Sequence, residues 1–199
     1  MNVREIKEKK VALLVADGFE QSELEGPLAA LRAAGAQALI VSPSEGRVRG
    51  WKHREWGEAF PVDVPLSQAR AADFDALVLP GGVMNPDTLR MNEQAVAFVR
   101  GFLESEKPIA AICHGPWTLI NAEGVEGRRM TSYPSIRKDL ENAGALWVDR
   151  EVVVDNGIVT SRSPADLPAF NTKMIEEIAE GPHPGTDRRR FVGHEARPM

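Results

Sequence analysis

Short, mainly apolar runs that alternate with helical patterns are the feature of this sequence that most restricts its fold. Runs of this length are typical of parallel strands that are buried on both faces. Leucines at helical spacing, from Leu24 to Leu31, follow the first run, and Gly35 is a suitable helix end. The runs are residues 11–16, 38–42, 74–79 and 109–112. The alternation predicts an α/β fold, a doubly wound and mostly parallel sheet with helices on both faces.

The segments between and after these runs predict the remaining elements. Residues 45–66 interrupt the alternation with glycines, prolines and aromatic residues, which indicates a small, irregular hairpin excursion. Asn92 can N-cap a helix with one apolar face, and Asn156-Gly157 favours a type I′ turn in a hairpin over residues 152–161. The other predicted elements are a strand over 129–132 and helices over 115–122, over 135–143 and from about residue 165.

Composition excludes several classes of protein. The chain has 24 Lys and Arg against 29 Asp and Glu, and a net charge of −5 argues against nucleic-acid or anionic-membrane partners. Residues 1–10 lack the apolar core of a signal peptide, and no apolar run approaches the ~20 residues of a membrane span. A single cysteine excludes an intrachain disulfide and fits a reducing compartment. We expect a cytoplasmic protein with one domain, 1–181, and a Pro/Gly/Arg-rich tail, 182–199, that is surface-draped or disordered.

The strongest chemical signal is Ala111-Ile-Cys-His-Gly-Pro116. A buried strand stops at Cys113 and a helix follows, with a small residue two before the cysteine and Gly115 two after it. This is the layout of a nucleophile elbow, in which the helix N-terminus favours a thiolate. An inert buried cysteine fits the local sequence about as well. His114, as the neighbour of Cys113, is a second candidate.

Two other loops leave strand ends at the same predicted edge of the sheet. In the acidic loop after the first strand, Glu20 can face the crevice, whereas helical spacing predicts that Glu23 and Glu25 face solvent. Acidic residues are also ordinary in the first turn of any helix. Gly81-Gly82 can direct backbone N–H groups at an oxyanion, or can form a plain tight turn. The histidines show no metal-ligand spacing, so we expect no metal.

Five ordered motifs resemble the PfpI family of intracellular cysteine proteases and deglycases, in the class I glutamine-amidotransferase-like superfamily. The resemblance covers about residues 10–181, and its motifs are Gly18-Phe-Glu-Gln-Ser-Glu-Leu24, Phe74-Asp-Ala-Leu-Val-Leu-Pro-Gly-Gly82, Ala111-Ile-Cys-His-Gly-Pro116, Thr131-Ser-Tyr-Pro134 and Thr160-Ser-Arg-Ser-Pro-Ala-Asp-Leu-Pro168.

The resemblance implies a flavodoxin-like fold with Cys113 as the nucleophile. It implies that Glu20 hydrogen-bonds the thiol and that His114 is the histidine after the nucleophile. In some members an acid from a neighbouring subunit completes this histidine, and the matching position here is Asp87. Gly82 and the backbone around His114 match the oxyanion site.

These residues favour a cysteine-dependent stress-response enzyme that acts on reactive small carbonyls. Cys113 would add to methylglyoxal, glyoxal or their glycated adducts, with Glu20 and His114 as proton shuttles and no cofactor, in a glyoxalase or deglycase reaction. One alternative is an intracellular cysteine peptidase, and another is a redox-sensing stress protein or chaperone that works through oxidation of Cys113. We also expect self-association to a dimer or hexamer, because Asp87 would act across subunits.

Overall fold

The central feature of the fold is a seven-stranded sheet in the order β11-β12-β8-β7-β1-β3-β6. The structure is a computed structural model that describes residues 6–184. Every strand pair in this sheet is parallel except β11–β12. The strands are β1 (Lys10–Leu14), β3 (Gln37–Ser42), β6 (Val64–Pro65), β7 (Ala76–Leu79), β8 (Ile109–Ile112), β11 (Val152–Asp155) and β12 (Ile158–Ser161). The apolar runs thus form the strands that their composition predicts.

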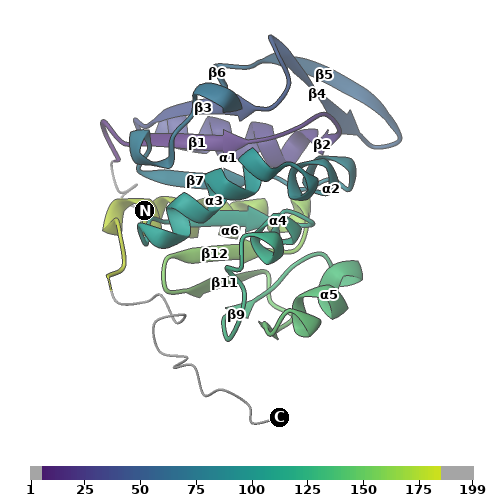
Figure 1. Ribbon diagram of the computed structural model, residues 1–199, viewed down its shortest axis with the longest axis vertical. Helices are drawn as coiled ribbons and strands as arrows, with labels where there is room; N and C mark the ends of the chain where they lie inside the picture. The colour runs from purple at the N-terminus through teal and green to yellow at the C-terminus, as the bar shows by residue number, and fades with distance from the viewer. Residues whose placement is uncertain (1–5, 185–199) are drawn as a thin grey trace.

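Helices cover both faces of the sheet (Figure 1). One face packs against α1 (Gln21–Ala33) and α6 (Leu167–Glu180). The other packs against α2 (Met84–Met91), α3 (Glu93–Glu104), α4 (Pro116–Asn121) and α5 (Arg137–Asn142). Short 3₁₀ helices lie at Leu66–Gln68, Ala71–Asp73, Pro134–Ile136 and Pro164–Asp166. The chain therefore has the predicted flavodoxin-like α/β architecture, with one buried core on each side of the sheet.

Two smaller sheets flank the central one. In the first, β4 (Arg47–Lys52) and β5 (Glu55–Pro61) form an antiparallel hairpin, and β2 (Phe19–Glu20) pairs parallel to β4. The predicted excursion is this hairpin, which extends beyond the main sheet (Figure 1). In the second, β9 (Arg129–Met130) pairs with β10 (Leu146–Trp147).

Local sequence signals are confirmed at two further positions. The Asn92 side chain accepts the Ala95 N–H at 3.0 Å and so caps α3. In the β11–β12 turn, Asn156 and Gly157 have φ of 50° and 78°, as a type I′ turn requires.

The loop after Gly81-Gly82 is shorter than a loop over residues 80–87, because α2 begins at Met84. Asp87 therefore lies within a helix rather than on a turn, which corrects our expectation for this residue. Pro86 is compatible with this helix because a first-turn residue needs no N–H donor. Helix α1 begins at Gln21 and contains Pro27, a residue at which the sequence allows a helix start or a kink.

The C-terminal tail lies mostly outside the described residues. Of the predicted tail, 182–199, the structure describes only 182–184, and it therefore does not test the expectation of a draped or disordered segment. Among residues 6–184 no helix combines the length and apolar character needed to cross a membrane.

Candidate active site

Cys113 occupies a strained turn between β8 and α4. Its φ is +62°, a left-handed conformation that is costly for a residue with a side chain. The turn is held by the Cys113 N–H, which donates to the Ser161 carbonyl at 3.0 Å, and by the Gly115 N–H, which donates to Ile112 at 2.8 Å. A Cβ at Gly115 would lie within 2.4 Å of the Leu79 carbonyl oxygen. The predicted elbow is therefore present, and its glycine is required by close approach of the backbone.

The Cys113 thiol is buried among groups that can exchange a proton with it. Its exposed fraction is 7%, and His114 Nδ1 lies 3.2 Å from Sγ. The backbone N–H groups of Gly82 and His114 lie beside the sulfur. Burial raises the thiol pKa, as does the nearby Glu23 carboxyl, whereas the two N–H donors lower it. The sulfur thus has donors that stabilise negative charge in a site that otherwise disfavours it.

The acid beside the thiol is Glu23 rather than Glu20. Glu23 is fully buried beside Cys113, and its Oε2 accepts the Gly81 N–H at 2.8 Å. Burial is the main reason that its pKa rises to about 8, and the negative charge of Glu20 adds to the rise. A carboxyl of this kind holds a proton near neutral pH and can donate it.

The expectations that Glu20 contacts the thiol and that Glu23 faces solvent are therefore wrong. Glu20 is partly exposed, and its Oε1 accepts a hydrogen bond from Ser22 Oγ at 3.0 Å. Helix α1 begins at Gln21, and the side that it buries includes Glu23 as well as the leucine stripe. Glu25 is exposed, as expected.

Gly81 and Gly82 have different roles. The Gly81 N–H holds Glu23, so the expectation that Gly81 contributes to an oxyanion site is wrong. Gly82 has φ +77°, and its N–H lies beside the sulfur and lowers the pKa of the thiol. A Cβ at Gly82 would lie 2.6 Å from the Gly18 carbonyl oxygen, so the two strand-end loops pack backbone to backbone. The Gly82 and His114 N–H groups are the pair that can stabilise an oxyanion.

A residue that we did not predict, Asn85, fixes the glycine loop. Its buried side chain accepts the Ala16 N–H at 2.7 Å and donates to the carbonyls of Pro80 and Gly81 at 2.9 and 3.0 Å. These bonds tie the ends of β1 and β7 together. Because a buried asparagine is unremarkable in sequence, its only signal was its position just after Gly81-Gly82.

His114 is held by a hydroxyl group that the sequence analysis also missed. Its Nε2 lies 3.0 Å from Ser135 Oγ, its ring stacks on Tyr133 at 4.9 Å, and Trp117 packs edge-on at 5.2 Å. Burial lowers the pKa of His114, which favours the neutral ring. Asp87 is exposed on α2, and its predicted role as an acid for a second subunit stays a prediction.

Comparison with known proteins identifies the family of this chain. The model of the DJ-1/PfpI family matches residues 9–177. This chain belongs to the DJ-1/PfpI family.

Relatives of this DJ-1/PfpI chain carry different functional names. "Putative cysteine protease YraA" from Bacillus subtilis is 45% identical over 167 residues, which cover 84% of this chain and 96% of that protein. "Protein/nucleic acid deglycase 2" from Escherichia coli is 45% identical over 170 residues, with 84% and 96% coverage. The crystal structure of Drosophila melanogaster DJ-1beta is 30% identical, covers 86% of this chain and 91% of that one, and superposes with a TM-score of 0.78.

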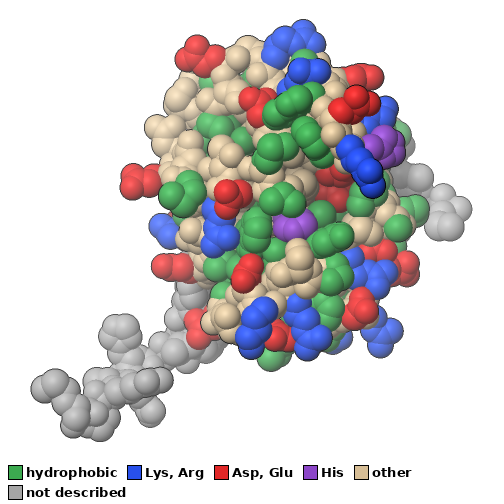
Figure 2. All heavy atoms as spheres, turned by 90° about the vertical axis from the view of Figure 1, so that its right-hand side faces the viewer, with side chains coloured by type: hydrophobic (Ala, Val, Ile, Leu, Met, Phe, Trp, Pro, Cys, Tyr) green, Lys and Arg blue, Asp and Glu red, His purple; other side chains and the backbone are tan. Residues whose placement is uncertain are grey.

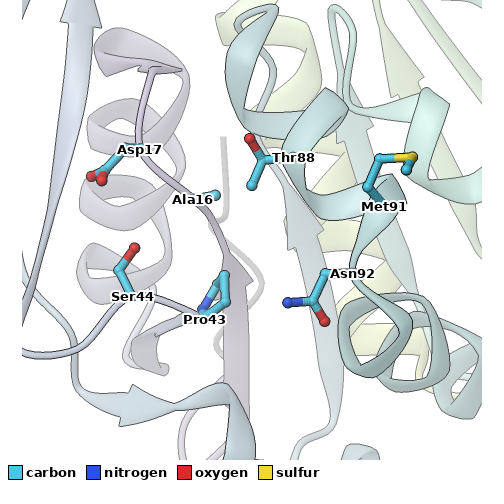
Figure 3. Close-up of a pocket in the computed structure, with 7 residues that line it drawn as sticks. All are labelled: Ala16, Asp17, Pro43, Ser44, Thr88, Met91 and Asn92. Carbon is cyan, nitrogen blue, oxygen red and sulfur yellow. The ribbon is translucent and has the colours of Figure 1, made fainter.

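The edge of the sheet that carries Cys113 also has a cavity. Figure 2 faces this edge and shows hydrophobic side chains gathered across its middle, with most charged side chains nearer the rim. A cavity of about 490 Å³ opens between the ends of β1 and β3 and helix α2 (Figure 3). Its lining residues are Ala16, Asp17, Pro43, Ser44, Thr88, Met91 and Asn92. The lining does not include Cys113 or His114, so this cavity is separate from the Cys113 thiol.

One group among residues 6–184 has metal-ligand spacing, and it lies away from Cys113. The ligand atoms of Glu177, Glu180 and His183 lie within 4.8 Å of one another, and His183 Nε2 is 3.1 Å from Glu177 Oε2. His183 packs beside Gly157, which precedes β12, whereas Cys113 follows β8. Since β8 and β12 are parallel, the Glu177, Glu180 and His183 group lies near the start of these strands and the Cys113 thiol lies at their carboxyl ends.

Proposed function

We propose that this DJ-1/PfpI protein is a cysteine-dependent enzyme that acts on reactive small carbonyls, as a deglycase or glyoxalase. The observation that carries the proposal is the convergence on one sulfur of His114 Nδ1, the Glu23 carboxyl and two backbone N–H donors. The deglycase name of the E. coli relative supports it. This set supplies a nucleophile, a base, an acid and an oxyanion site within one chain.

The reaction with methylglyoxal starts with the sulfur. The thiol proton passes to His114 Nδ1, sulfur forms a bond to the aldehyde carbon, and the carbonyl electron pair moves onto oxygen. The N–H groups of Gly82 and His114 stabilise this oxyanion, which takes the Glu23 proton and becomes a hemithioacetal. The carbon bonded to sulfur then loses its proton while the ketone oxygen gains one, which gives an enediol. The second carbon takes a proton, the first hydroxyl loses its proton, and a thioester results. Water cleaves the thioester, releasing lactate and restoring the thiol, and the His114 imidazolium returns its proton to Glu23.

A glycated amine enters the same scheme at its hemiaminal carbon. In one route the adduct releases its aldehyde, which then reacts with Cys113 as above. In the other route Cys113 displaces the amine from the hemiaminal carbon. In both routes the leaving amine takes a proton, and the sulfur is left in the same hemithioacetal. The later steps are shared, and no redox co-reactant is required.

The runner-up is a cysteine peptidase, which the name of the B. subtilis relative favours. It would use the same sulfur, with attack on a peptide carbonyl and an acyl-enzyme intermediate. Both Cys113 and His114 are only 7% exposed, and such restricted access suits a small aldehyde better than an extended peptide.

We also propose that the protein self-associates through the α2 face. Val83, Met84 and Met91 are 56%, 39% and 78% exposed there, and Asp87 lies on the same helix. A second copy that covers these apolar side chains would bring its own Asp87 near the edge of the sheet that carries Cys113.

The experiment that tests the function compares substrates and a matched variant. Purified protein is given methylglyoxal, a methylglyoxal-treated amino acid and an unfolded peptide, with lactate release and peptide cleavage measured, and Cys113→Ser is run beside it. We expect lactate from wild type, none from Cys113→Ser and no cleavage. Lactate formation that survives in Cys113→Ser, or cleavage without lactate, contradicts the proposal.

A further inference from the structure

The second ring nitrogen of His114 meets a hydroxyl group from its own chain. Nε2 and Ser135 Oγ are 3.0 Å apart, while the other nitrogen, Nδ1, is 3.2 Å from the Cys113 sulfur. The three side chains therefore form the line Cys113–His114–Ser135. A ring that is hydrogen-bonded at both nitrogens has its orientation set, and its tautomer follows from which neighbour donates.

The backbone around Ser135 is fixed on both sides. On one side, the Tyr133 N–H donates to the Cys113 carbonyl at 2.9 Å, which ties this segment to the elbow itself. On the other side, Ile136 is 1% exposed in the core. Between them the chain forms the 3₁₀ turn Pro134–Ile136. The hydroxyl is thus positioned by anchored neighbours, although the Ser135 residue is itself exposed.

We propose that Ser135 is the positioning residue that sets the tautomer of His114, an inference that rests on the proposed function. By accepting a hydrogen bond from Nε2–H, Ser135 Oγ leaves the lone pair on Nδ1 directed at the Cys113 thiol. When Nδ1 takes the thiol proton, Nε2–H still donates to Oγ, so the imidazolium forms without rearrangement. The hydroxyl proton of Ser135 remains free for solvent or for an acceptor from a second chain.

The other groups around His114 lie at Nδ1 or against the ring, and none of them hydrogen-bonds Nε2. Cys113 and, through it, Glu23 lie at Nδ1, and Tyr133 covers a ring face. Trp117 contacts the ring edge and in turn binds Asp139 of α5, at 2.7 Å, and the guanidinium of Arg90 of α2. Loss of the Ser135 hydroxyl therefore removes the partner at Nε2 while leaving these neighbours in place.

The direct test is the ¹⁵N NMR spectrum of the His114 ring as a function of pH, in wild type, Ser135→Ala and Ser135→Thr. We expect the Nε2–H tautomer in wild type and in Ser135→Thr, which keeps the hydroxyl. In Ser135→Ala we expect a mixture of tautomers and a lower His114 pKa, because the imidazolium loses an acceptor. An unchanged tautomer and pKa in Ser135→Ala overturns the inference.

Kinetics on methylglyoxal give a second readout. Ser135→Ala should lower kcat/KM by about tenfold to a hundredfold and move the acid limb of its pH profile to lower pH, and Ser135→Thr should restore both. A loss without movement of the limb would mean that Ser135 is merely structural. If wild type does not turn over methylglyoxal, the proposed function fails, while the NMR titration still decides the role of Ser135.

Discussion

Replacing Glu23 by Gln should show how much of the activity depends on the proton of the buried carboxyl, because Gln has nearly the same shape. Gln keeps an oxygen that can accept the Gly81 N–H, which Glu23 now accepts at 2.8 Å, but it has no proton to give up. We expect kcat/KM on methylglyoxal to fall by roughly 10²-fold, the scale of a positioned proton shuttle. Glu20→Gln is the matched control, and because Glu20 is partly exposed it should change kcat/KM by only a few-fold.

The same substitution has a calculable effect on stability. Folding raises the Glu23 pKa from 4.5 to about 8, so the folded state favours the protonated carboxyl. Its favourable contribution is complete below pH 4.5 and is lost as the pH rises through about 8. A shift of this size corresponds to at most about 5 kcal/mol. Urea unfolding from pH 5 to 9 should therefore show Glu23→Gln gaining stability relative to wild type with rising pH. Parallel stability curves together with a wild-type pH–rate profile would refute the reasoning.

Three further predictions concern the elbow and the subunit arrangement. Mild peroxide should add oxygen to the Cys113 peptide, seen by mass spectrometry, because N–H donors stabilise an oxidised sulfur; an unmodified thiol at doses that oxidise exposed methionines would contradict this. Gly115→Ala should cost about 1–3 kcal/mol in thermal unfolding and most of the activity, since its Cβ would meet the Leu79 carbonyl; full activity would mean that the elbow tolerates displacement. Mixed and reassociated Cys113→Ala and Asp87→Ala chains should recover part of the activity, and a fully active monomer by light scattering would refute the shared site.

The parts of the fold that could be predicted are those set by local chemistry. The buried strands followed from runs of apolar residues, the β11–β12 turn from Asn156-Gly157, and the start of α3 from the Asn92 cap. Helix α2 could not be found in this way. It is only Met84–Met91, and its buried apolar side chains are Pro86 and Leu89, so its sequence carries no clear helical stripe.

The candidate site was predictable only where one short segment builds it. Cys113, His114 and Gly115 are consecutive, so the elbow was visible in sequence. Ser135 lies beside His114 because the nearby Tyr133 N–H donates to the Cys113 carbonyl. Tyr133 and Cys113 are twenty residues apart, so no local sequence pattern predicts this contact. The choice between Glu20 and Glu23 depended on the same kind of information, because the contact of Glu23 with Gly81 joins residues that are far apart in the sequence.

Among residues 6–184 a second glutamate, Glu177, is also buried, and it shows what distinguishes a poised acid from a structural one. Burial raises the pKa of both carboxyls, but His183 Nε2 lies 3.1 Å from Glu177, and the charge of that ring offsets part of the rise there. The neighbours of Glu23 are the Gly81 N–H, which donates to the carboxyl, and the Cys113 thiol, and neither supplies positive charge. Its proton is therefore retained near neutral pH beside the one cysteine of the chain. A helical pattern treats every glutamate as a surface residue, so an acid that is buried without a cation can be recognised only once its neighbours in space are known.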